Sequence, residues 1–235
     1  MMQLNQSLRL TLGLLGMVAV GAATVSPSWA GPPGWRRVFQ FLTSEAEDRR
    51  EGRNGGPRPG DLCLLNPGRG EQVWSRTPVF IWQGLTTTVG VRGNDPETLL
   101  WQQTATQKAQ VYTAAYGQAS LSPGTYEWVF LDGDGQPLLW SPFEVVDEAA
   151  YAAHGEELAA LQQELEAAEA SDADIALART TYFADHNLSS DALQEVFAVS
   201  DPSPELLELQ ADLVQEFCAG PSQMEPTDRQ RPAGE

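Results

Sequence analysis

The pattern of apolar residues in this chain changes abruptly at about residue 146, and this change limits the folds available to it. Between residues 61 and 146, short runs of Val, Ile, Leu, Trp, Tyr and Phe alternate with turn residues at intervals of roughly ten, as in antiparallel sandwiches and barrels. From residue 147 to 220 the chain is rich in Ala, Leu and Glu, with Leu158, Leu161 and Leu165 at helical spacing. We therefore expect an α+β protein, in which an antiparallel β-sandwich over 61–146 is followed by a small helical subdomain over 147–220.

One hairpin is clearly marked within the β segment. Ser122-Pro123-Gly124 precedes an alternating strand around Trp128, and Asp132-Gly133-Asp134-Gly135 then turns the chain into Pro137–Val146. The residues from Asp132 also begin like a calcium-binding loop, which has oxygen ligands at its first and third positions. The sixth position of such a loop requires Gly, and Pro137 stands there. A hairpin turn is therefore the expected structure.

The first thirty residues have the order of a secretory signal peptide. A polar start leads into an apolar stretch from Leu10 to Ala23, and Ser28 and Ala30 are the small residues that precede a cleavage site. Gly21-Ala22-Ala23 offers a second cleavage site. The alternative is a membrane anchor, but the apolar stretch is shorter than the roughly 20 residues that span a bilayer. We expect residues 1–30 to be removed and the mature protein, without a membrane span, to be periplasmic or extracellular.

Two further segments lack a long amphipathic pattern. Residues 31–60 are dense in Pro and Gly at both ends and carry charges of both signs between them. The apolar residues between Val38 and Leu42 could support one short helix, but a flexible Arg/Gly/Pro-rich arm is the prediction, acting as a solvated linker rather than a contact patch. Residues 221–235 are predicted to be a disordered tail.

The chain has two cysteines, Cys63 and Cys218. In an oxidising compartment one disulfide is their simplest state. Such a bond would close a loop of about 155 residues, which the loop-entropy model values at roughly 5 kcal/mol at most. Two separate buried thiols are the alternative. Neither cysteine lies in a Cys-x-x-Cys motif or beside a histidine, so neither redox catalysis nor metal binding by thiolates is indicated.

The negative charge is concentrated in the helical segment. The chain has 32 acidic and 14 basic side chains, a net charge of −18, and residues 147–220 contain 17 of the acidic residues with Arg179 as their single basic one. General binding to nucleic acid or to anionic lipid is therefore not expected. The acidic helical surface could hold cations or basic partners loosely.

Motifs of the common enzyme classes are absent from the sequence: it contains no phosphate-binding loop, dinucleotide fingerprint or nucleophile elbow. The histidines, His154 and His186, both fall in the helical segment, where surface or helix-end positions are expected. Paired carboxylates such as Glu156-Glu157, and Asp172 with Asp174, are expected on solvated helix faces rather than in a cleft. We predict no catalytic residue, no cofactor and no metal site.

The tryptophans of the β segment divide into two groups. Alternation places Trp82 in phase with Phe80, and Trp128 in phase with its own apolar neighbours, so these two are expected to point into the core. Trp101, followed by two glutamines, and Trp140, followed by Ser-Pro, are less clearly buried. They are the candidates for exposed contact with a ligand.

Four short motifs carry a resemblance to known families. An Arg/Gly-rich arm ends in Cys63, Thr77-Pro78-Val79-Phe80 follows, and Asp191-Ala192-Leu193 precedes the late Cys218. In this layout the chain resembles an uncharacterised exported protein family of cyanobacteria, although Ser189-Ser190 stand where that family has aromatics. The β part, with its L-x-P-G-x-Y-x-W run, also resembles bacterial immunoglobulin-like and fibronectin III-like domains. The resemblance implies an exported protein with this layout, and implies no catalytic activity.

These observations favour a non-enzymatic exported protein that interacts with another envelope protein or with a polysaccharide. The alternative is a carbohydrate-binding module that uses Trp101 or Trp140. A third hypothesis is an enzyme of unfamiliar type whose acid and base are carboxylates of the helical segment.

Overall fold

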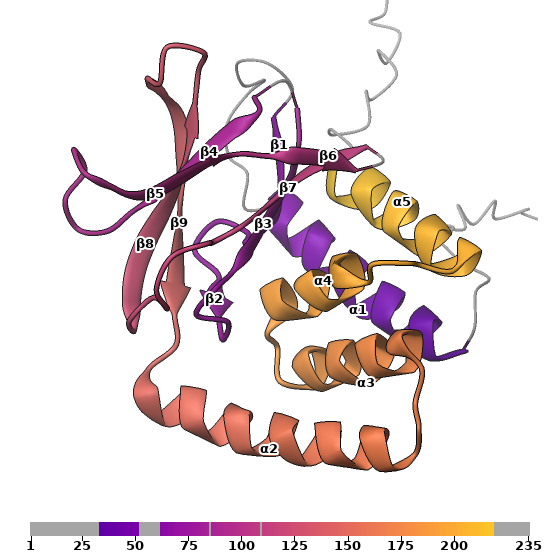
Figure 1. Cartoon of the computed structure of the whole chain (residues 1–235). Helices are drawn as coiled ribbons and strands as arrows, with labels where there is room; N and C mark the ends of the chain where they lie inside the picture. Colours follow the sequence, from indigo (N-terminus) through magenta and orange to yellow (C-terminus); the bar gives the residue numbers. More distant parts are fainter. Residues whose placement is uncertain (1–32, 52–61, 85, 109, 219–235) are drawn as a thin grey trace, which may run out of the picture.

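The computed structural model describes residues 33–51 and 62–218, apart from residues 85 and 109 (Figure 1). The predicted leader at 1–30 and tail at 221–235 lie outside these described residues. The helices are α1 (Pro33–Glu51), α2 (Glu148–Ala167), α3 (Asp172–Asp185), α4 (Ser189–Ala198) and α5 (Pro204–Cys218). The strands are β1 (Cys63–Asn66), β2 (Gln72–Val73), β3 (Val79–Gln83), β4 (Thr88–Arg92), β5 (Leu99–Thr104), β6 (Thr106–Lys108), β7 (Val111–Ala115), β8 (Gly124–Leu131) and β9 (Pro137–Val145).

The strands form two sheets that pack face to face. The four-stranded sheet has the order β1-β3-β7-β6, and the five-stranded sheet has the order β2-β9-β8-β4-β5. Paired strands run antiparallel, except that β2 runs parallel to β9. The prediction of an α+β protein with an antiparallel β part is therefore confirmed at this level.

The predicted hairpin joins β8 to β9. The Asp132 carboxylate oxygen Oδ1 accepts the backbone N–H groups of Asp134 at 2.9 Å and Gln136 at 2.8 Å. Gly135 has a φ of 77°, a conformation that glycine adopts without steric cost. The Asp132 carboxylate thus shapes a turn, as expected, and one of its oxygens is occupied by the backbone of that turn.

Aromatic side chains fill the space between the two sheets. Phe80 and Trp82 point inward from β3, and Trp128 and Phe130 from β8, and none of the four is exposed. The rings of Phe80 and Trp128 stack at a centroid distance of 5.3 Å, and Trp82 meets Phe130 edge-on at 5.4 Å. Such pairs add about 0.5–1.5 kcal/mol to the free energy of simple apolar burial. The inward orientation predicted for Trp82 and Trp128 is confirmed.

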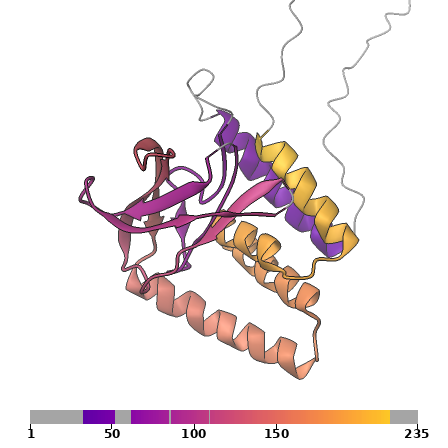
Figure 2. The same ribbon diagram turned by 45° about the horizontal axis from the view of Figure 1, so that its top comes forward.

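Helices cover the other face of the four-stranded sheet. Leu65 of β1 and Ile81 of β3 are fully buried in a second apolar core, which they share with residues of α1, α3, α4 and α5. Figures 1 and 2 show these helices gathered on one side of the sheets. The described chain therefore has three layers: the five-stranded sheet, the four-stranded sheet and the helices. The helical segment is not a separate subdomain, because its core is continuous with the sheet.

The prediction of a flexible arm over 31–60 is wrong for residues 33–51, which form helix α1. Trp35, Val38, Phe39, Leu42 and Ala46 recur every three or four residues and are all buried. They pack in the helical core, where α1 contacts α3 and α5. Burial of one large apolar side chain stabilises the folded protein by about 1.5–3 kcal/mol. These tertiary contacts therefore stabilise a helix that the local sequence indicates only weakly. Residues 52–61 of the predicted arm lie outside the described residues.

Helix α4 is attached to the sheets by a buried carboxylate. Asp191 accepts the backbone N–H of Trp74 at 2.7 Å through Oδ2 and that of Ser75 at 2.9 Å through Oδ1. Beside it, Gln194 accepts the N–H of Val79 at 2.9 Å, and the Ser190 hydroxyl donates to Glu71. Burial raises the pKa of Asp191 to about 7, against the opposing effect of its two backbone hydrogen bonds. These bonds satisfy N–H groups of the β2–β3 segment and set the position of α4 on it.

Cys63 and Cys218 form a disulfide, as predicted. The bond joins the start of β1 to the end of α5, across 155 residues of sequence. It therefore ties the last helix of the helical layer directly to the sheet that this layer covers.

Removing the disulfide should lower the free energy of unfolding by about 2–5 kcal/mol, because the unfolded chain would lose a long covalent loop. Urea denaturation of a Cys63→Ser/Cys218→Ser variant and of the unreduced wild type measures the difference. The wild type, unfolded without reductant, should react with no thiol-alkylating reagent. Two alkylated cysteines in that experiment would contradict the disulfide.

Asp191 should make stability fall as the pH rises. Because its pKa in the folded protein is about 7, and that of an unfolded Asp is about 3.9, the folded state binds one more proton between these values. The free energy of unfolding should then decrease with pH across this window, by up to about 1.4 kcal/mol per pH unit from this group.

The variant Asp191→Asn removes the titrating group and keeps the shape of the side chain. Urea denaturation at several pH values from about 4 to about 7 should give a less negative slope for this variant than for the wild type. The variant should also be less stable at each pH, because an amide nitrogen replaces one acceptor. Equal slopes would show that Asp191 does not exchange a proton on folding.

Candidate functional site

The outer face of the five-stranded sheet is the open face of the β part. Its inner face packs on the four-stranded sheet, whose own outer face is covered by helices, and Figure 1 shows no described helix over β5, β8 and β9. Leu138 and Trp140, two residues apart on β9, are 55% and 49% exposed. A half-exposed tryptophan beside an exposed leucine is a candidate contact surface in a chain whose other large aromatics are mostly buried.

The Trp140 side chain is supported by an anchored arginine. The Arg92 guanidinium lies 5.2 Å from the centroid of the Trp140 ring, within the range of a cation–π interaction. Arg92 donates through Nε to Glu127 at 2.6 Å and through Nη1 to the carbonyl oxygen of Pro96 at 3.0 Å. The strand register places Arg92 opposite Glu127, and Gly90 and Trp140 both opposite Val129. The open face therefore carries an aromatic ring next to a fixed pair of charges.

Trp101, the other predicted contact residue, is not available to a ligand. It is 7% exposed and lies in the core between the sheets. Its ring stacks on Phe80 at 5.8 Å and meets Tyr116 edge-on at 5.5 Å. Pairing of β5 with β4 sets Trp101 opposite the buried Val91, so the register of the sheet directs it inward. The prediction was wrong because it relied on the two glutamines that follow Trp101. They are exposed because β5 is an edge strand, and their exposure does not extend to Trp101.

The carboxylate pairs of the helical segment lie at the surface, as expected. Glu156, Glu157, Asp172 and Asp174 are all exposed. Ser171 caps α3 by accepting the N–H of Asp174 at 3.2 Å. These acids are therefore solvated, and those at the start of α3 also stabilise the positive end of its dipole.

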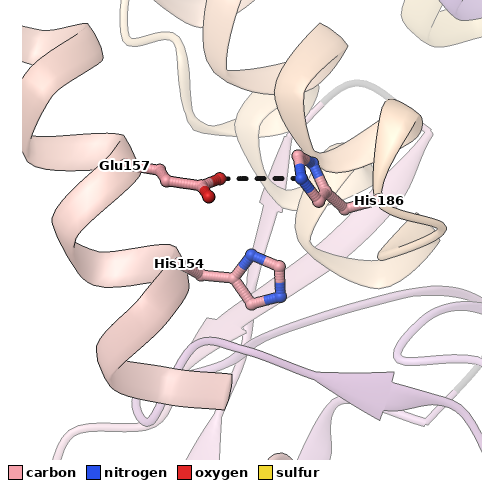
Figure 3. Close-up of side chains that lie close together, drawn as sticks. All are labelled: His154, Glu157 and His186. Atoms are coloured by element: carbon pink, nitrogen blue, oxygen red, sulfur yellow. Dashed lines mark ion pairs between the residues drawn. The ribbon is translucent and has the colours of Figure 1, made fainter. Parts of the chain in front are cut away.

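The structure brings His154, Glu157 and His186 together, a grouping that was not predicted (Figure 3). One possible ligand atom of each residue lies within 4.8 Å of the others. His186 Nε2 is 3.6 Å from a Glu157 oxygen, and the two imidazole rings are 5.1 Å apart. His186 ends α3, as its helix-end prediction stated, whereas His154 is half-buried in the middle of α2. These side chains are the best-placed described residues for holding a metal ion.

Tyr182 links the members of this cluster. Its hydroxyl donates to Glu157 at 2.8 Å and lies 2.7 Å from His154 Nδ1. Burial and the neighbouring Glu157 carboxylate raise the pKa of Tyr182. Burial, followed by the nearby His186, lowers the pKa of His154, and Glu157 partly opposes this. Both shifts favour the neutral forms of the tyrosine and of His154. The missed signal was the i, i+3 spacing of His154 and Glu157, which places them on one helix face.

A pocket of about 170 Å³ lies between the four-stranded sheet and helices α4 and α5. Apolar side chains dominate its lining, among them Val79, Val111, Phe197, Leu207 and Val214. No carboxylate lines this pocket, so it does not provide the acid and base that an enzyme of the helical carboxylates would need.

Among the described residues, no helix is both long enough and apolar enough to cross a membrane. The apolar stretch of the predicted leader lies outside them.

No protein-family model matches the chain, and no curated protein matches it. The predicted resemblance to an exported cyanobacterial family therefore has no support from a family match. Three solved structures match weakly. The structure of CopC from Methylosinus trichosporium OB3b is 15% identical, covers 37% of this chain and 95% of its own, and has a TM-score of 0.28. The fibronectin(III)-like modules of Clostridium thermocellum CbhA are 11% identical, cover 37% and 94%, and have a TM-score of 0.24.

The third match, an engineered protein, is 13% identical, covers 39% of this chain and 20% of its own, and has a TM-score of 0.28. At these scores the likenesses carry no inference about a ligand or an activity.

Proposed function

We propose that this protein is an exported, non-enzymatic binding protein of the cell envelope, and that the open sheet face around Trp140 is its contact surface. The observation that carries the proposal is the half-exposed Trp140 on the one sheet face that no described helix covers. Aromatic and arginine side chains are the residues most enriched at binding hot spots. Trp140 and the exposed Leu138 supply the contact surface on β9, and the buried Arg92 supports the Trp140 ring from beneath.

The order of the strands supports an immunoglobulin-like assignment of the β part. When β1, β3, β7 and β6 are taken as strands A, B, E and D, the second sheet becomes A′-G-F-C-C′, an arrangement close to that of variable-type domains. The Tyr126 hydroxyl donates to the carbonyl oxygen of Ser122 at 3.0 Å near the start of β8, where such domains have their tyrosine corner. Because this fold hosts many functions, the proposal rests on the exposed face and not on the assignment.

Export is supported by two independent features. The leader pattern ends in small residues at Ser28 and Ala30. The Cys63–Cys218 disulfide is of a kind that persists in oxidising compartments and is rare in the cytosol. A periplasmic or extracellular location accounts for both.

Carbohydrate binding is the second candidate, and the geometry of Trp140 favours it over a purely apolar contact. The flat ring of Trp140 lies over the buried Arg92, whose partner Glu127 is partly exposed beside it. A sugar ring has an apolar face that can stack on an aromatic ring, and hydroxyl groups that can bind neighbouring polar groups. Ligand sites of this kind combine aromatic surface with a few placed polar groups. The first candidate, an envelope protein, would use the same residues as a hot spot.

Expression of the full chain in a Gram-negative bacterium tests export. The mature protein should be recovered from the periplasm or medium, oxidised and beginning at Gly31, as mass spectrometry of its N-terminal peptide would report. A variant lacking residues 2–30 should stay in the cytoplasm. An uncleaved full-length chain that stays in the cytoplasm with reduced cysteines would contradict export.

Replacing Trp140 with Ala should weaken binding of the ligand at least about tenfold, since loss of a hot-spot aromatic costs 2 kcal/mol or more. Isothermal titration of the mature protein with a panel of envelope polysaccharides gives the affinity for the carbohydrate candidate. Chemical crosslinking in envelope extract captures a protein partner of the same face. The variant's urea midpoint should stay near that of the wild type, because Trp140 lies outside the core.

Leu207→Ala is the matched control, because Leu207 is 44% exposed on α5 in the helical layer. This variant should bind as the wild type does. No response to any polysaccharide would remove the carbohydrate candidate. The proposed contact face would be contradicted if Trp140→Ala and the wild type gave identical titrations and identical crosslinked partners.

A further inference from the structure

We propose that His154, Glu157 and His186 form a binding site for a divalent transition-metal ion of the zinc class, held between helices α2 and α3. The two histidines are the only ones in the chain, and they lie on different helices. Figure 3 shows both rings and the Glu157 carboxylate directed into the space between α2 and the end of α3. This proposal is independent of the Trp140 face, which lies on β9 in the five-stranded sheet.

The helical hairpin of α2 and α3 sets the position of the three side chains. His154 and Glu157 lie on one face of α2, and the short connection after α2 returns the chain alongside it as α3. His154 is 13 residues before the end of α2, and His186 is 14 residues after the start of α3. Because both helices rise by about 1.5 Å per residue, the two histidines lie at nearly equal distances from the connection between the helices. They are therefore side by side. The backbone of two regular helices therefore holds the site.

The Nδ1 proton of the His186 imidazole is placed as in metal sites. His186 Nδ1 is 2.7 Å from the carbonyl oxygen of Tyr182, which can only accept, so Nδ1 carries a proton, and in the neutral ring Nε2 is the nitrogen with the lone pair that a metal ion needs. That Nε2 is the atom 3.6 Å from the Glu157 carboxylate. A backbone carbonyl on the second nitrogen is a common partner of metal-binding histidines, because it fixes the tautomer and the ring orientation.

Tyr182 holds the other two ligands. Its hydroxyl proton is donated to Glu157, and its oxygen lies 2.7 Å from His154 Nδ1. The hydroxyl therefore joins a carboxylate oxygen to an imidazole nitrogen without an ion present. With the hydroxyl proton directed to Glu157, His154 Nδ1 donates to the hydroxyl oxygen; to bind an ion through Nδ1 the neutral ring would carry its proton on Nε2 instead, and Tyr182 would remain a donor to the carboxylate. Tyr182 is thus a positioning residue.

The distances suit a small movement on binding. Ligand atoms that hold an ion tetrahedrally at 2.0–2.1 Å are about 3.3 Å from one another, and the atoms of this cluster are within 4.8 Å. Glu157 and His186 are exposed and His154 is half-buried, so rotation of exposed side chains closes the gap. Three protein ligands leave the fourth position open to water.

The donor set and the surrounding charge select the class of ion. Two imidazoles with one carboxylate suit zinc and its first-row neighbours, whereas calcium and magnesium prefer sites made of oxygen atoms alone. Residues 147–220 contain 17 acidic side chains and one basic one, which raises the local concentration of cations. The nearby Arg37 is paired with Asp185 at 2.6 Å, so its charge is partly neutralised.

Calorimetric titration of the mature, disulfide-bonded protein with Zn²⁺ tests the site. One ion should bind per chain, and the melting temperature should rise with Zn²⁺ concentration because the ion binds the folded state. Mg²⁺ and Ca²⁺ should not compete. Co²⁺ bound in place of Zn²⁺ should show the visible absorption of an ion that has nitrogen ligands.

Three variants separate the proposed site from loose binding to the acidic surface. His186→Ala and Glu157→Gln should each weaken Zn²⁺ binding at least about tenfold. Glu156→Gln removes the same charge one residue away and should leave binding unchanged. Circular dichroism of each variant checks that it is folded, and Tyr182→Phe should weaken binding less than His186→Ala does.

The proposal is overturned if Zn²⁺ does not bind, if several ions bind with equal affinity to wild type and His186→Ala, or if Glu156→Gln weakens binding as much as Glu157→Gln. If His186→Ala and Glu157→Gln lose Zn²⁺ binding but bind the ligand of the Trp140 face as the wild type does, the two sites are separate.

Discussion

Strand β3 is buried on both of its faces, and the arrangement of the rest of the chain depends on this double burial. Phe80 and Trp82 point into the core between the sheets, while Ile81 points into the core beneath the helices. A strand with apolar side chains on both faces cannot leave one of them in water. The helical layer is therefore required by the four-stranded sheet, and the five-stranded sheet keeps the only open sheet face among the described residues.

The helical layer is attached by contacts of different physical kinds. Most of the core residues that the helices contribute belong to α1, α4 and α5, and the attraction between apolar side chains has little directional preference. The position of the helices on the sheet is set by two directional contacts. The Asp191 carboxylate accepts two backbone N–H groups beside the sheet edge, and the Cys63–Cys218 bond joins α5 to β1. Helix α2 has Leu158 as its buried residue. It is held at its start by the stacking of Tyr151 on Trp74 at 5.3 Å and farther along by the cluster around Tyr182.

This distribution explains where the two proposed sites lie. The Trp140 face is open because the helices are needed elsewhere, on the far side of the four-stranded sheet. The histidine cluster lies where α2, the least buried helix of the layer, approaches α3. An ion bound there would join these two helices at a point where few apolar contacts do so. Both sites are thus located at surfaces that the apolar cores leave free.

Much of the β part could be predicted from the sequence, because a period of two in apolar residues directly indicates which side chains share a face. That rule placed Trp82 and Trp128 correctly, and the turn residues from Asp132 to Gly135 located the β8–β9 hairpin. It failed for Trp101, since the side of the sheet to which an edge strand directs a residue depends on its pairing with β4. Two cysteines allow a single pairing, so the disulfide could also be predicted, together with the helices after residue 147. The open sheet face could not, because no local pattern states what covers a sheet.

Local patterns therefore determined the strands and the later helices, which follow from short-range backbone and side-chain preferences, and the presence of two cysteines left one possible pairing for the disulfide. The tertiary structure alone decided that residues 33–51 form a buried helix, because its apolar stripe is stable only against α3 and α5. It alone brought His154, Glu157 and His186 together, because their separation in space depends on how two helices pair. Contacts between segments distant in sequence have no signature in either segment, and in this protein both the helical layer and the candidate metal site are made of such contacts.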